Sequence, residues 1–207
     1  MRKIAVIIAF VAGLFAQGAG TFPAYAADRQ PVDQIKDFDD GLLASMKAGK
    51  AAGMDGRSAV LAPVIDRVFD MPEMTRLSLG SSAKTLTDDQ TKSLIDAFRK
   101  YTIASYAGNF DEFGGEKFEV GEPRPGVGDR VVVPTKLIPG DGTAPVSLDY
   151  VMHQTGGQWR VIDILAEGAV SQMAARRAEF VTVLRHDGFD GLLAAIAKKT
   201  QAAATKQ

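Results

Sequence analysis

Acidic residues at the end of an apolar run are the first candidates for chemistry in this chain. Asp163 alternates with Trp159 and Val161, and Glu167 follows just before Gly168. A carboxylate buried among apolar side chains has a raised pKa unless it is paired, and such a group can act as a general base. The same pattern arises when an Asp forms a structural ion pair or accepts hydrogen bonds from backbone N–H groups. Asp163 is therefore either a candidate base or a structural anchor. The basic residues that could pair with it are Arg160, Arg176 and Arg177.

Other reactive groups are scarce. The chain has no cysteine, and its two histidines, His153 and His186, lie far apart and outside any metal-binding spacing. No Gly-x-Ser-x-Gly nucleophile elbow, phosphate-binding loop or dinucleotide fingerprint occurs. We therefore expect no metal site, no cofactor and no nucleophilic catalysis.

The N-terminal residues have the order of a secretory signal peptide. Arg2 and Lys3 precede an uncharged apolar run at residues 4–15, and residues 24–26 form an Ala-x-Ala exit. An uncleaved anchor is the alternative, but the run is shorter than the ~20 residues of a membrane span. We predict a signal peptide at 1–26, cleaved between Ala26 and Ala27.

The mature chain is short enough for one domain. Removing the leader takes away two basic residues and leaves 24 − 2 = 22 basic against 25 acidic residues, a net charge of −3. A mildly acidic chain does not favour nucleic acid, which rewards concentrated Lys and Arg. We predict a single domain at 27–199 and a frayed, flexible tail at 200–207.

The first half of the mature chain has helical spacing. Apolar residues recur every three or four positions in 31–49, 57–80 and 87–110. Pro63 and Pro72 should kink or divide the second segment. In the third segment, Thr87 and the glutamine three residues later match a capping box.

The second half has the alternation of strands and then returns to helix. We expect strands at about 116–121, 129–138, 146–153 and 159–165, with an edge or bulge at Pro134. Two helices follow at about 171–186 and 189–199. This order predicts an α+β fold with about four strands in a curved antiparallel sheet, and with helices on one face enclosing an apolar cavity.

Methionine and aromatic residues are spread over all of these segments. Such side chains fill cores, and they also form adaptable linings for flexible apolar ligands. Composition alone leaves both readings open. The residues that we expect to line such a pocket are Val64, Phe69, Met71, Met74, Phe98, Tyr101, Tyr106, Tyr150, Met152, Trp159, Val161, Ile164, Met173 and Phe180.

An ordered series of motifs resembles one family. The stretches "VFDMPEMTRLSLG", "FGGEKFEV", "QWRVIDILAEGAVS" and "GFDGLL" occur in the order found in the MlaC/Ttg2D (toluene tolerance, Tgt2) family, over roughly residues 59–199. The chain departs from the family at Ser81, Ser82 and Ala83, where an aromatic residue is usual. One branch of the family is associated with hopanoid-producing bacteria.

The resemblance implies an NTF2-like α+β body and a periplasmic lipid carrier. It implies phospholipid or hopanoid-type cargo, and an inner-membrane lipid transporter and an outer-membrane lipoprotein complex as partners. Exposing ~30 methylenes of a two-chain lipid to water would cost on the order of 24 kcal/mol, so transit through water needs an apolar sleeve and no reactive group.

The resemblance then gives the junction at residues 163–171 a structural interpretation. Gly168 permits a turn, Ser171 caps the next helix, Glu167 orients the turn or the pocket mouth, and Asp163 is tied to a basic partner. Two alternatives stay open. One is an NTF2-like enzyme with Asp163 or Asp149 as general base, and the other is a docking subunit that carries nothing.

Overall fold

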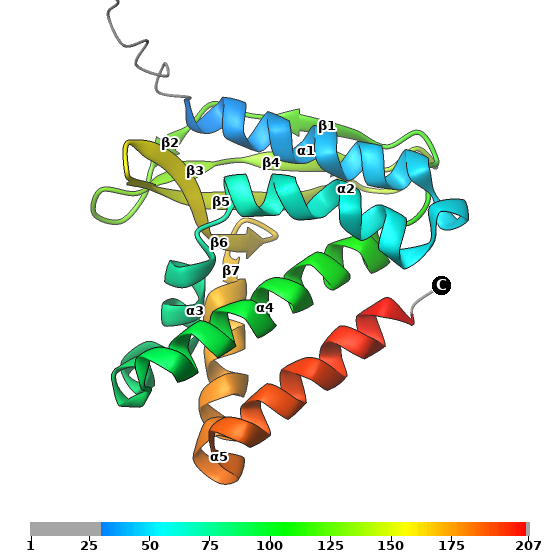
Figure 1. Ribbon diagram of the computed structural model, residues 1–207. Helices are drawn as coiled ribbons and strands as arrows, with labels where there is room; N and C mark the ends of the chain where they lie inside the picture. The colour runs from blue at the N-terminus through cyan, green and yellow to red at the C-terminus, as the bar shows by residue number, and fades with distance from the viewer. Residues whose placement is uncertain (1–29, 206–207) are drawn as a thin grey trace, which may run out of the picture.

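The computed structural model describes residues 30–205 of the chain (Figure 1). Residues 1–29, which include the predicted signal peptide and its cleavage site, lie outside the described residues. The α-helices are α1 (Pro31–Ala48), α2 (Gly53–Val68), α3 (Met71–Leu79), α4 (Asp88–Asn109) and α5 (Gln172–Ala204), with short 3₁₀ helices at Lys50–Ala52 and Gly80–Thr85. The strands are β1 (Lys117–Val120), β2 (Arg124–Pro125), β3 (Val131–Val133), β4 (Thr135–Ile138), β5 (Val146–Thr155), β6 (Gln158–Ala166) and β7 (Val170–Ser171).

Local signals in the sequence set the ends of the helices. The Thr87 hydroxyl accepts a hydrogen bond from the Gln90 N–H, and the Gln90 side chain accepts one from the Thr87 N–H, which confirms the capping box. Pro72 falls in the first turn of α3, where a missing N–H costs nothing. The second expected segment is divided just before Pro72, between α2 and α3, whereas Pro63 lies inside α2 and does not end that helix.

The sheet is built around the long strand β5. It pairs along one edge with β6, and along the other edge with β4 and then β3, all antiparallel. Strand β1 extends the sheet beyond β4, β2 beyond β3, and β7 beyond β6. The expected strand at 129–138 is two strands because Pro134 interrupts the ladder, and the Pro134 carbonyl instead accepts a hydrogen bond from the Gly121 N–H.

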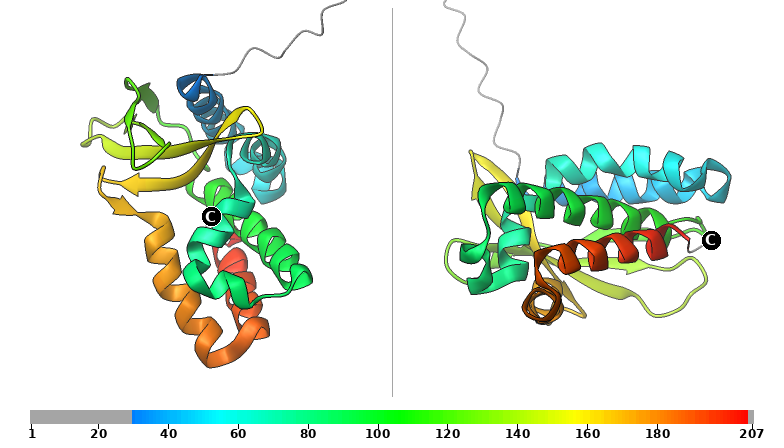
Figure 2. Two further views of the ribbon diagram at one scale, coloured as in Figure 1. Left: turned by 90° about the vertical axis from the view of Figure 1, so that its left-hand side faces the viewer. Right: turned by 60° about the horizontal axis from the view of Figure 1, so that its bottom comes forward.

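Helices α1 and α2 lie side by side across one face of this curved sheet (Figure 2). The core forms there, where Phe38 of α1 contacts the Phe69 and Tyr150 rings edge to face at 4.9 and 5.9 Å. On the opposite face, Val132 and Ile162 belong to a second, smaller apolar cluster, against which Leu77 and Leu165 pack. The α+β prediction is confirmed.

The two expected C-terminal helices are the two halves of α5. Gly188 interrupts the helix with φ 70° and ψ −171°, a conformation open to glycine, and the second half returns along α4 (Figures 1 and 2). The expectation of a frayed tail is wrong for residues 200–204, which are helical. Their last turn lies against α4 so closely that a side chain at Gly108 would overlap the Ala203 carbonyl.

Within residues 30–205, no helix combines the length and apolarity needed to cross a bilayer.

Candidate functional site

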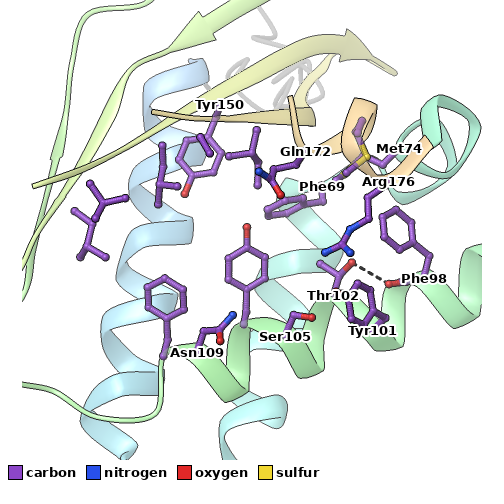
Figure 3. Close-up of a pocket in the computed structure, with 18 residues that line it drawn as sticks. Phe69, Met74, Phe98, Tyr101, Thr102, Ser105, Asn109, Tyr150, Gln172 and Arg176 are labelled. Carbon is purple, nitrogen blue, oxygen red and sulfur yellow. Dashed lines mark hydrogen bonds between the residues drawn. The ribbon is translucent and has the colours of Figure 1, made fainter. Parts of the chain in front are cut away.

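A cavity of about 410 Å³ opens between α4, the sheet and the first turns of α5 (Figure 3). Its wall is apolar and aromatic over most of its area. Eight of the residues expected in a lipid pocket line it, namely Phe69, Met74, Phe98, Tyr101, Tyr106, Tyr150, Ile164 and Met173. They come from six different elements or their ends, so the cavity exists only once the helices have packed on the sheet.

The periodicities of α4 and β5 explain how the wall forms. Helix α4 contributes side chains at positions 98, 101, 102, 105, 106 and 109, which share one face because they are spaced by three or four. Strand β5 contributes Val146, Leu148 and Tyr150, which share one face because they are two apart. One helix face and one strand face therefore meet across the hollow.

Two buried tyrosines stand in this wall. Burial raises the pKa of Tyr106 and of Tyr150, and the nearby Asp39 raises both further. Both phenols therefore stay neutral over the physiological pH range. Asp39 itself lies behind the wall on α1, where burial, and to a lesser degree Asp40, raises its pKa to about 8.

Six expected residues do not line the cavity, because they are packed elsewhere. Val64 fits against Gly41 at the contact of α1 and α2. Phe180 lies behind the wall, with its ring edge to face with Phe98 at 5.7 Å. The remaining four lie in the core or pack against it, and they are Met71, Met152, Trp159 and Val161.

The prediction from sequence also missed part of the cavity lining. The missed residues are Thr102, Ser105, Asn109, Phe110, Leu137, Val146, Leu148, Ala166, Gln172 and Arg176. Helical spacing places Ser105 and Asn109 on the same face as Phe98, and strand alternation places Leu148 on the same face as Tyr150. These three residues could therefore have been predicted from the sequence. The polar members were passed over because the expected pocket was wholly apolar. Nothing in the local pattern marked Arg176.

The two candidate catalytic carboxylates lie outside the cavity wall. Asp163 accepts hydrogen bonds from the N–H groups of Ile164 and Met173, at 2.7 and 3.0 Å, and from the Ser171 hydroxyl. The expected basic partner of Asp163 is therefore wrong, and backbone donors take its place. Asp149 is nearly buried and accepts a hydrogen bond from Arg124 at 2.8 Å. Both carboxylates have structural partners.

The junction that carries Asp163 is a tight turn into a helix. Gly168 and Glu167 both have positive φ, 70° and 51°. Ser171 is the N-cap of α5, with its hydroxyl oxygen accepting a hydrogen bond from the Ala174 N–H at 2.9 Å. The Asp163 charge at this helix N-terminus is favourable, because the helix dipole is positive there. Glu167 is not part of the cavity wall, and its role at the mouth stays a prediction.

The histidines show no metal-like arrangement. The His153 ring nitrogen Nε2 lies 2.8 Å from Asp70, the residue that caps α3. No group of three or more metal-ligating side chains occurs within residues 30–205.

Comparisons with known proteins agree with this architecture. The chain is 24% identical over 190 residues to the "Toluene tolerance protein ttg2D" of Pseudomonas putida, covering 86% of each chain. A solved phospholipid-binding protein from Ralstonia solanacearum, in complex with a phospholipid, has the same fold, with a TM-score of 0.70 and 22% identity over 86% of this chain and 100% of that one. The model of the family described as "MlaC protein" matches residues 36–198. The chain belongs to the MlaC family.

Proposed function

We propose that this protein is a periplasmic phospholipid carrier that holds acyl chains in the cavity between α4, the sheet and α5. The observation that carries the proposal is the cavity itself, which has an apolar wall and a volume of about 410 Å³. Volumes of ~300–1,000 Å³ are typical of ligand pockets in proteins. Each methylene moved from water into such a wall contributes about 0.8 kcal/mol.

Family membership supports the same reading. The Ralstonia solanacearum protein of the same fold is in complex with a phospholipid, and a curated relative is a toluene tolerance protein. Shuttling between an inner-membrane lipid transporter and an outer-membrane lipoprotein complex is part of the proposal and rests on the family resemblance. A hopanoid-type lipid is the alternative cargo.

The geometry favours a carrier over the other two hypotheses. An enzyme using Asp163 or Asp149 would need its base in the cavity, and neither carboxylate is in the wall. A docking subunit that carries nothing would have a filled interior, whereas this one is hollow.

A vesicle pick-up assay tests the proposal with Leu148→Glu. Leu148 is partly buried on the cavity side of β5, so a charge there makes acyl burial unfavourable. Protein freed of lipid is mixed with phospholipid vesicles, the vesicles are removed, and the phosphorus that stays with the protein is measured. We expect near-stoichiometric phospholipid on the wild type and at least a tenfold lower load on the variant.

Ser147→Glu is the matched control. It introduces the same charge one position earlier on β5, where the side chain points to the opposite face of the sheet. This control should load like the wild type. Equal loading of Leu148→Glu and the wild type, with both proteins folded, would show that the lipid lies elsewhere.

A further inference from the structure

The cavity wall carries one positive charge. Among the described residues, Arg176 is the only charged side chain in the wall. It reaches from α5 toward α4, where its guanidinium lies over the Tyr101 ring at 4.8 Å from the centroid (Figure 3). Stacking of this kind holds the guanidinium plane and leaves the N–H donors at its edge free to bind an anion.

The neighbouring carboxylate neutralises this charge only in part. The Arg176 Nη1 atom lies 3.7 Å from Glu179, which is beyond hydrogen-bond distance. The same carboxylate accepts a closer contact, at 2.7 Å, from Lys199. Two cations therefore share one anion, and the three groups together carry a net charge of 2 − 1 = +1.

Neutral polar side chains share the cavity wall with the guanidinium. Ser105 and Asn109 of α4 and Gln172 of α5 also line the cavity (Figure 3). Their side chains form no hydrogen bond with other residues in the range 30–205. A hydroxyl, two amides and a guanidinium thus offer hydrogen-bond donors to the same largely apolar hollow.

A second hollow meets the cavity at the same place. This recess, of about 240 Å³, shares Tyr101, Ser105, Asn109 and Arg176 with the cavity. Its remaining wall comes from the last turns of α5. Those residues are Lys199, Ala202 and Ala203.

We propose that the border of the two hollows, formed by Arg176, Ser105 and Asn109, is a subsite for the phosphodiester of a lipid headgroup. This assignment rests on the proposed carrier function and adds to it the residues that bind the phosphate. The acyl chains lie along Leu148 and Tyr150, the phosphate lies at Arg176, and the headgroup substituent occupies the recess beside Lys199. Arg forms bidentate, charge-assisted hydrogen bonds with phosphate oxygens, which an uncharged lipid cannot accept in the same way. The site therefore selects phospholipid over lipids that lack a phosphate.

The test compares two lipids with identical acyl chains, phosphatidylglycerol and diacylglycerol. Each competes with a fluorescent fatty acid for wild-type protein freed of lipid. We expect the wild type to bind phosphatidylglycerol about tenfold more tightly than diacylglycerol, the size of effect given by one charge-assisted hydrogen bond. In Arg176→Gln, the affinity for phosphatidylglycerol should fall about tenfold and the affinity for diacylglycerol should not change.

Two further variants separate recognition from general charge and from folding. Arg185→Gln removes the same charge from an exposed position on α5 and should leave both affinities unchanged. Arg176→Lys keeps the charge and the stem but loses the planar fork, so it should retain part of the preference even if the glutamine variant folds poorly.

The binding results distinguish a failure of the phosphate subsite from a failure of the carrier function. A wild type that binds both lipids equally, or an Arg176→Gln variant that loses both equally, overturns the phosphate subsite and leaves the carrier standing. A wild type that binds neither lipid overturns the carrier and the subsite together. Inorganic phosphate should not displace the probe, and displacement at concentrations like those of the lipid would assign the site to free phosphate instead.

Discussion

At the residue scale, burial keeps the groups behind the cavity wall neutral. The Asp39 carboxylate is 3% exposed, and neither of its oxygens has a hydrogen-bond partner among the described residues 30–205. An ionised carboxylate without partners is costly in such a place, so the proton stays on to about pH 8. The core around Tyr106 and Tyr150 thus stays uncharged.

This raised pKa has a consequence for stability. The folded chain holds the Asp39 proton between about pH 4 and pH 8, whereas the unfolded chain has already lost it. The free energy of unfolding should therefore fall as the pH rises through this window, and level off above it. A pKa raised from 3.8 to about 8 corresponds to at most about 6 kcal/mol.

Asp39→Asn should remove most of this pH dependence. We expect the variant to be more stable than the wild type at pH 8 by roughly 1–3 kcal/mol, since it carries no charge to desolvate, and to be similar at pH 5. Urea unfolding at both pH values measures this. Asp40→Asn is the control, because Asp40 is exposed and is the smaller cause of the shift. A wild type whose stability is flat between pH 5 and pH 8 would show that Asp39 is ionised in the fold.

Sequence patterns predicted single residues only in part. Alternation correctly placed Tyr150 and Met152 on one strand face, but only the end of that face near α4 and α5 borders the cavity. Where a face is packed and where it is hollow depends on the helices that cover it, and periodicity contains no information on that. Arg176 was missed for the same reason, since its neighbour Tyr101 lies 75 residues away in the sequence.

At the element scale, the second half of α5 packs against α4. Gly108 allows the Ala203 carbonyl to approach the α4 backbone, and the Gly188 bend brings α5 back to that point.

Periodicity predicted most of the helices and the long strands. It missed the two-residue strands β2 and β7, which are too short to show alternation, and it missed the end of α5. The polar, alanine-rich sequence after Lys199 has helical propensity, but its packing depends on a glycine in another helix.

Gly108→Ala tests this contact. The added methyl group overlaps the Ala203 carbonyl, so we expect a loss of about 1–3 kcal/mol in the free energy of unfolding. A chain that ends at Lys199 lacks the Ala203 carbonyl. There the same substitution should be neutral or stabilising by about 0.5–1 kcal/mol, because alanine favours helix over glycine. Urea unfolding is measured for the wild type and Gly108→Ala, each as the full chain and as the chain that ends at Lys199. The difference between the two effects of the substitution is the coupling energy between Gly108 and residues 200–207. Equal effects in the long and short chains would show that residues 200–204 do not pack on α4.

At the scale of the whole molecule, the family, the fold and the cavity agree on one account. The chain has the α+β architecture of the MlaC family, and helices folded over a curved sheet leave an apolar hollow of about 410 Å³. Fold class followed from the order of helical and alternating segments. The hollow could not be predicted in this way, because a filled core and an open pocket use the same residue types.

Organic extraction of the purified protein, followed by mass spectrometry of the lipid released, is the direct test of the carrier function. We expect phospholipid in near-stoichiometric amount, with a phosphate on every abundant lipid species. A protein that yields no lipid, and takes up none after incubation with phospholipid vesicles, would contradict the carrier function.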